Sequence, residues 1–307
     1  MLNKTPKILI PILSSFLCLF TLIEVNFPRL QPQSQLSVFV MLGLILCFLN
    51  FPVEERWKKN LACQVVDLVL SLATVGACSY VVLMSEPILN QWFPHLWPYG
   101  KSLGDRAGIE GHTDFVIGAV GLLLVLEASR RSIGWIVPML AMLFVGHSFY
   151  SYLAYEKVVP KLPEWLLPHA GQDIEYLVSA TFSQSLGVFG PAASVMFKYV
   201  FLFVLFGAFL ELSGATRFII NFTEKLFGNS PGGPAKVAVL GSGLMGSLSG
   251  SAVANAVTTG AFTIPMMRNA GFQKHVAGGI TAAAAASPRS RSRASRSRSS
   301  RKPSAAQ

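Results

Sequence analysis

The sequence predicts an all-α integral membrane protein with about six transmembrane helices, a re-entrant helical hairpin, interfacial helices and a disordered C-terminal tail. Three observations support this fold class: the composition, six apolar stretches of membrane-spanning length, and an uncharged run rich in glycine and hydroxyl residues. Of the 307 residues, 52% are hydrophobic and only 13% are charged, whereas roughly a quarter of a soluble domain is charged. The composition is that of a membrane protein.

The net charge of +10 is concentrated in the last residues of the chain. Residues 287–307 hold seven basic and no acidic side chains, which leaves 18 basic against 15 acidic residues in the rest. The body of the protein is therefore nearly neutral, and its basic pI says little about what the folded part binds.

Six apolar stretches come close to the roughly 20 residues that a helix needs to cross a bilayer. Lys4 and Lys7 precede the first stretch, as they would in a signal peptide. A second span follows within about a dozen residues and no small-residue cleavage site intervenes, so a membrane helix is preferred. The stretches are residues 8–25, 36–53, 61–84, 115–126 with their flanks, 134–155 and 192–212.

Two long connections, 86–113 and 156–173, are rich in tryptophan and proline. Tryptophan favours the headgroup region of a membrane, which predicts interfacial elements there. Residues 174–190 show helical spacing but carry polar side chains, and we expect them to form a helix on the membrane surface.

The distribution of Lys and Arg predicts a cytoplasmic N-terminus. With that orientation, inside segments hold ten basic residues and outside segments hold five, in keeping with the excess of positive charge in cytoplasmic loops.

Residues 241–260 read GSGLMGSLSGSAVANAVTTG and contain no charge. The run includes a GxxxG helix-packing motif and a GxGxxG pattern, but a dinucleotide site needs a following acidic residue, and none occurs after Glu224. Glycine and hydroxyl residues at this density break a membrane helix, and a broken helix exposes carbonyls and hydroxyls that bind Na⁺. The oxygen-bearing side chains are Ser247, Ser249, Ser251, Asn255, Thr258 and Thr259.

The run and its surroundings resemble a known transporter family. Residues 201–215 (FLFVLFGAFLELSGA), residues 232–272 around the run, and LEASRRSIG at 126–134 are similar to the fused permease of TRAP (tripartite ATP-independent periplasmic) transporters of the type that works with TAXI-class binding proteins. The resemblance extends less sharply over the chain to about residue 280.

The resemblance implies a Na⁺-driven importer of organic acids, dicarboxylate-like, in the bacterial inner membrane, supplied by a periplasmic TAXI-type solute-binding protein. It implies a small-subunit-like region at 1–112 and the N-terminal part of a large-subunit-like transport domain at 113–286. The implied sodium site at the hairpin tip is Ser249, Gly250 and Ser251, and the implied substrate-binding residues are Asn255, Thr258 and Thr259.

The tail at 287–307 departs from the family, whose members continue into a second hairpin. An RNA-binding segment and a polybasic membrane anchor are two interpretations of its Arg/Ser sequence. We favour a third, a frame-shifted or truncated end that is not native to the fold, with no nucleic-acid partner. On that interpretation transport by this chain alone is in doubt.

No nucleophile and base combination or Walker motif occurs, so neither an enzyme nor a bound cofactor is expected. The alternative function is a membrane-embedded scaffold subunit without transport activity of its own. Asp67 lies within the third span, where pairing or a subunit contact is preferred to catalysis. His147, in the fifth, is expected to be a hydrogen-bonded structural residue rather than a proton relay.

Overall fold

The structure is a computed structural model that describes residues 5–52, 61–92, 97, 101–106, 111–160, 163–167, 169–249 and 252–299. These residues contain helices and connections but no strand. The chain forms two compact units, residues 1–200 and 201–307. The division falls within the sixth apolar stretch, so the boundary at residue 112 stays a prediction.

The six predicted spans are confirmed as helices that are long and apolar enough to cross a membrane. The first five are α1 (Thr5–Asn26), α2 (Pro32–Asn50), α3 (Leu61–Ser85), α5 (His112–Ile133) and α6 (Ile136–Tyr155). The sixth, Pro191–Leu212, is made of α8 (Pro191–Val195), the π-helical η7 (Met196–Val200) and α9 (Phe201–Leu212).

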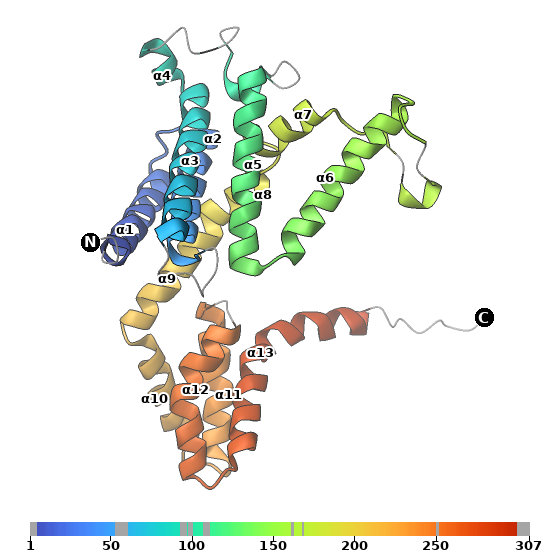
Figure 1. Cartoon of the computed structure of the whole chain (residues 1–307). Coiled ribbons are helices and arrows are strands. Elements are labelled where there is room, and N and C mark those ends of the chain that lie inside the picture. Colours follow the sequence, from blue (N-terminus) through green and yellow to red (C-terminus); the bar gives the residue numbers. More distant parts are fainter. Residues whose placement is uncertain are drawn as a thin grey trace, which may run out of the picture. The chain divides into compact units, whose positions relative to one another are not determined.

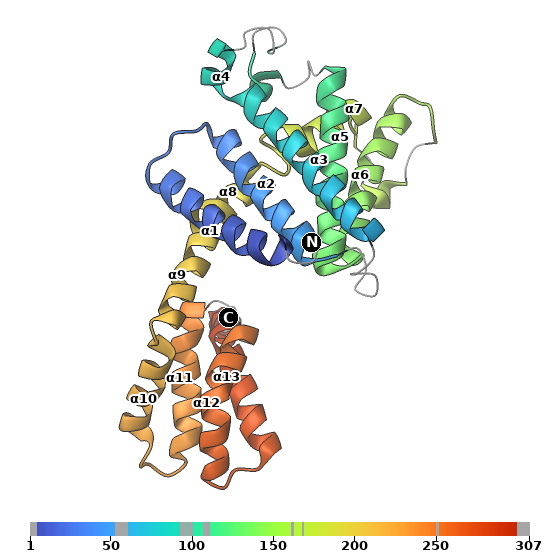
Figure 2. The ribbon, with the colours of Figure 1, turned by 60° about the vertical axis from the view of Figure 1, so that its left-hand side comes forward.

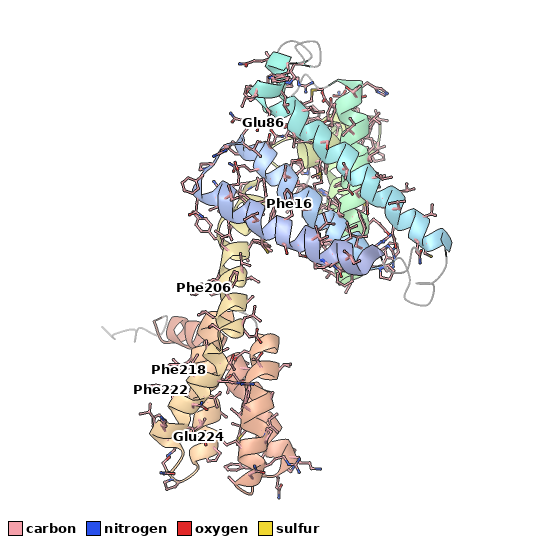
Figure 3. All side chains as sticks on the ribbon, turned by 90° about the vertical axis from the view of Figure 1, so that its left-hand side faces the viewer. Phe16, Glu86, Phe206, Phe218, Phe222 and Glu224 are labelled. Atoms are coloured by element: carbon pink, nitrogen blue, oxygen red, sulfur yellow. The ribbon has the colours of Figure 1, made fainter. Side chains whose placement is uncertain are left out.

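These helices carry large apolar side chains on their outer faces. On α6, Met139, Leu143 and Phe144 are 64–66% exposed, and Figure 3 shows Phe16 on α1 and Phe206 on α9, which are also exposed. A soluble protein would bury such residues. In a bilayer they contact lipid, so the surface agrees with the predicted class.

The core of the first unit lies between α2, α3 and α5, which run side by side in Figure 1. Phe48 of α2, Val81 of α3 and Leu124 of α5 are at most 4% exposed. Phe197 of η7 is fully buried, and the ring of Phe39 meets it edge-on with the centroids 5.3 Å apart. Through these contacts η7 packs against the N-terminal helices.

The long connections contain only short helices within the described residues. They are α4 (Pro87–Trp92), the 3₁₀ turns η4 (Leu103–Arg106) and η5 (Glu164–Leu166). Trp92 and Trp165 are 77% and 78% exposed, as expected for side chains in the headgroup region.

Residues 174–190 do not form the single surface helix that was expected. They form α7 (Ile174–Val178), the π-helix η6 (Ser179–Ser183) and a turn in which Val188 N–H donates to Thr181 O at 2.7 Å. Phe182 and Phe189 are at most 2% exposed, with ring centroids 5.2 Å apart. Burial of these two rings against α5 favours the folded-back arrangement over a helix lying on the surface.

The second unit is a bundle of α10 (Ala215–Phe227), α11 (Gly233–Ser249), α12 (Ala252–Asn269) and α13 (Lys274–Ser299), seen in Figure 2. Helix α11 contacts each of the other three. Ala238, Met267 and Ala277 form the buried centre of the bundle. Small alanine side chains on α11 and α13 let the helix backbones approach closely.

Helix α13 continues to Ser299, although disorder was expected from residue 287. The alanine run at 282–286 is a strong helix former, and the helix continues from it into the tail. Residues 300–307 lie outside the described part of the chain.

Candidate functional site

The glycine- and hydroxyl-rich run forms two helices with a break between them, as predicted. Helix α11 ends at Ser249 and α12 begins at Ala252, and the two pack against each other as a helical hairpin. The expected sodium residues lie at this break. Gly250, Ser251 and the side chain of Ser249 fall outside the described residues, so their sodium role stays a prediction.

The break brings opposite helix ends together. The last carbonyls of α11 and the first N–H groups of α12 have no partner within their own helices. The macrodipole makes the C-terminal end of α11 partly negative and the N-terminal end of α12 partly positive. Helix ends of these two kinds favour a cation and an anion, respectively.

Asn255 joins the two arms of the hairpin close to this tip. Its side chain is 1% exposed, and Nδ2 donates to the carbonyl oxygen of Ser242 at 2.8 Å and to its hydroxyl oxygen at 3.1 Å. The amide oxygen Oδ1 is also buried, and no residue in the described part of the chain donates to it. A buried acceptor without a donor costs free energy unless an ion or water occupies the space beside it.

Thr259 lies on the same face of α12, one turn after Asn255. It is fully buried, and its hydroxyl donates to Asn255 O at 2.7 Å. Thr263 repeats this bond to Thr259 O at 2.9 Å. These hydroxyls satisfy carbonyls of their own helix, which leaves Asn255 Oδ1 as the buried oxygen without a donor in the described length of α12.

Thr258 lies on a different face of α12 and is half-buried. The structure thus brings Asn255 and Thr259 together on the inner face of the hairpin and sets Thr258 apart from them. Ser242 is the partner that the sequence analysis missed. It belongs to the same polar run, but nothing local distinguishes it from the neighbouring serines.

A cluster of four charged residues connects α3 with α5, at the end of α5 that is predicted to face the cytoplasm. Arg131 Nη1 donates to Asp67 Oδ1 at 2.6 Å, and its Nε donates to Glu127 Oε1 at 2.8 Å. Among the described residues, Arg130 forms an ion pair with Glu127 alone, at 2.7 Å. The prediction that Asp67 is paired is confirmed, and the pairing is with α5.

A second buried network lies at the opposite end of α5. Asp114 is fully buried and receives hydrogen bonds from Tyr80 Oη at 2.6 Å, Arg106 Nη1 at 3.1 Å and Gly111 N at 3.0 Å. Sequence analysis missed this network because Tyr80 comes 34 positions before Asp114, and no local pattern marks Arg106 and Asp114 as a buried pair. The two networks hold both ends of α5 against α3.

His147 lies with Nε2 2.9 Å from Leu166 O, a hydrogen-bonding distance, and its ring centroid is 5.3 Å from that of His169. This contact joins α6 to the connection that follows it. It supports the structural role predicted for His147. Within the described residues, no group of three His, Cys, Asp or Glu side chains is placed to hold a metal.

Six apolar helices and a polar helical hairpin define a multi-pass membrane protein. Residues 120–288, more than half of the chain, match the family described as "Tripartite ATP-independent periplasmic transporter, DctM component". The chain belongs to this family of TRAP transporter permeases, which is not a class of enzymes. No solved structure matches it significantly.

Three relatives illustrate the similarity. The isethionate TRAP transporter permease protein of Oleidesulfovibrio alaskensis is 26% identical over 285 residues, covering 86% of this chain and 40% of that protein. The 2,3-diketo-L-gulonate TRAP transporter large permease protein of Escherichia coli is 41% identical over 80 residues, covering 26% of this chain and 19% of that protein. The C4-dicarboxylate TRAP transporter large permease protein of Rhodobacter capsulatus is 35% identical over 78 residues, covering 25% of this chain and 18% of that protein. The matches thus span less than half of each relative.

Proposed function

We propose that this protein is the membrane permease component of a Na⁺-coupled secondary transporter that imports organic acids delivered by a periplasmic binding protein. The observation that carries the proposal is the hairpin α11–α12, with the buried oxygen Asn255 Oδ1 close to its break. Membership of the TRAP permease family supports the same function.

The coupling ion would bind where α11 ends. Na⁺ is a hard cation that prefers oxygen ligands, and unwound carbonyls at the end of a broken helix supply them in secondary transporters. Asn255 Oδ1 would add a side-chain ligand, with Ser249, Gly250 and Ser251 at the tip. An ion there would also remove the free-energy cost of leaving Oδ1 without a donor.

The substrate would bind at the start of α12. A helix N-terminus favours an anion because its N–H groups and the macrodipole both point toward it. The relatives are named for isethionate, 2,3-diketo-L-gulonate and C4-dicarboxylates, all organic acids. We therefore propose an organic acid, dicarboxylate-like, close to Asn255, Thr258 and Thr259.

The partner would be a solute-binding protein of the TAXI type in the periplasm, with the permease in the bacterial inner membrane and its N-terminus in the cytoplasm. Residues 1–112 would act as the small-subunit-like region and residues 113–286 as part of the transport domain. The relatives' names support a TRAP system in general, and the TAXI assignment rests on the sequence resemblance.

The test is uptake of a labelled four-carbon dicarboxylate by proteoliposomes that contain the full chain, with its binding protein outside. We expect uptake under an inward Na⁺ gradient and none with choline. Asn255→Ala should reduce Na⁺-dependent uptake roughly tenfold or more, the factor expected when a buried polar contact is lost.

Asn269→Ala is the matched control, because Asn269 lies on the same helix but is exposed at its end. It should leave uptake unchanged. A membrane scaffold without transport activity would show no Na⁺-dependent uptake and no binding of labelled Na⁺, and either variant would then behave as the parent protein. That result would replace the transporter proposal with the scaffold function.

A further inference from the structure

Four basic residues lie together at one end of the four-helix bundle, which we call the basic end. At this end α10 connects to α11 and α12 connects to α13, as Figures 1 and 2 both show. Lys225, Lys236, Arg268 and Lys274 lie in the terminal turns that meet there, and all four are exposed. Glu224, labelled in Figure 3, is the single acidic residue between positions 215 and 280.

An apolar hollow opens on the side of the bundle next to this basic end. It has a volume of about 370 Å³ and is formed by α10, α11 and α13, within the range of ~300–1,000 Å³ that small-ligand pockets span. Its lining residues are Phe227, Ala235, Lys236, Val239, Leu240 and Ile280.

Lys236 links the hollow to the basic end. Its carbon stem contributes to the apolar lining, while Nζ lies 3.2 Å from Ser230 Oγ in the turn between α10 and α11. A lysine in a membrane protein adopts this arrangement when its stem contacts hydrocarbon and its ammonium group reaches the headgroup layer. The charge is therefore placed at the rim and the apolar surface behind it.

We propose that the hollow and the basic end bind one anionic phospholipid, with an acyl chain against Val239 and Leu240 and the phosphate at Lys236. An apolar wall alone would accept any lipid. Lys236 at the rim and the other exposed cations of the basic end, with Glu224 as the acidic residue between positions 215 and 280, select a headgroup with net negative charge. A small soluble anion would use the cations but leave the hollow unfilled.

The experiment is native mass spectrometry of the purified full chain in micelles containing equal amounts of dioleoylphosphatidylglycerol and dioleoylphosphatidylcholine. Phosphatidylglycerol adducts should exceed phosphatidylcholine adducts at least about fivefold, the preference that one basic residue near a membrane surface provides. Lys236→Gln should reduce this ratio about fivefold.

Two further variants separate the contribution of the apolar hollow from that of the positive charge. Val239→Trp fills the hollow without altering charge and should lower retention of both lipids, whereas Lys101→Gln, a lysine of the first unit, should change nothing. Equal retention of the two lipids by the parent protein would overturn the proposal. So would a preference for phosphatidylglycerol that Val239→Trp leaves intact, because the cations would then bind the phosphate alone. Neither readout depends on transport, so this result is independent of the uptake test.

Discussion

Arg131 illustrates how single residues hold the first unit together. Its side chain is 1% exposed and donates to Asp67 of α3, to Glu127 of its own helix and to Phe51 O at the end of α2. The guanidinium carbon also lies 5.1 Å from the ring centroid of Phe48. One side chain thus joins three helices by contacts that only a planar, multiply donating group can make.

Replacing Arg131 with Gln should destabilise the protein by about 3 kcal/mol, because Asp67 would lose the donor that compensates its charge and Glu127 would keep only Arg130. The free energy of unfolding, measured by SDS titration in mixed micelles, checks this value. Arg130→Gln is the matched control, since among the described residues Arg130 forms an ion pair with Glu127 alone, stacks over the Trp135 ring at 5.2 Å and is 22% exposed. It should cost less than about 1 kcal/mol.

The double variant Asp67→Asn, Arg131→Gln should be less destabilised than the two single changes predict together, because no uncompensated Asp67 charge remains. Strict additivity of the two losses, or an Arg130→Gln loss as large as that of Arg131→Gln, would contradict the pairing.

At the scale of elements, the packing of η6 on α5 depends on two glycines. A Cβ atom built at Gly121 would lie 2.2 Å from the Phe182 ring, and one at Gly118 would lie 3.2 Å from Ser183 Oγ. The π-helix can approach α5 closely only because both positions lack a side chain. The fold of residues 174–190 is therefore determined by α5, not by their own helical spacing.

Gly121→Ala should destabilise the protein by about 2 kcal/mol, because the ring of Phe182 is surrounded and cannot move aside freely. Its thermal unfolding midpoint in detergent measures the loss. Gly146→Ala, in the neighbouring α6, is the matched control because nothing lies within 4 Å of a Cβ built there, and alanine is the better helix former. The interpretation fails if both changes have the same effect.

At the scale of the whole molecule, the two units differ in the interactions that hold their helices together. The first holds five of the apolar helices and both charge networks, whereas the second holds the hairpin and the basic end. In the first unit, α3 and α5 are held at both ends by ion pairs and hydrogen bonds. The hairpin arms are joined by hydrogen bonds between uncharged groups, of which Asn255 to Ser242 is the buried example.

The proposed orientation predicts which loops face the periplasm. In a variant whose four native cysteines are replaced, a cysteine at position 101 should react with a membrane-impermeant maleimide added to spheroplasts. A cysteine at position 225 should react only after the membrane is opened. We expect this labelling pattern because the segments assigned to the cytoplasm hold the excess of Lys and Arg. Labelling of position 225 alone in intact spheroplasts would reverse the topology.

The sequence by itself determined the membrane class, the six apolar helices and the break near residue 250, since length, hydropathy and glycine content are local properties that act within one helix. Only the tertiary structure decided that Asp67 pairs with Arg131, 64 positions away, that Asn255 bonds to Ser242, and that residues 174–190 fold back onto α5. Such contacts depend on which helix faces are brought together, and no single segment encodes that. The helical start of the tail was also missed, because its composition predicts disorder and the helix that begins at Lys274 nevertheless continues through it.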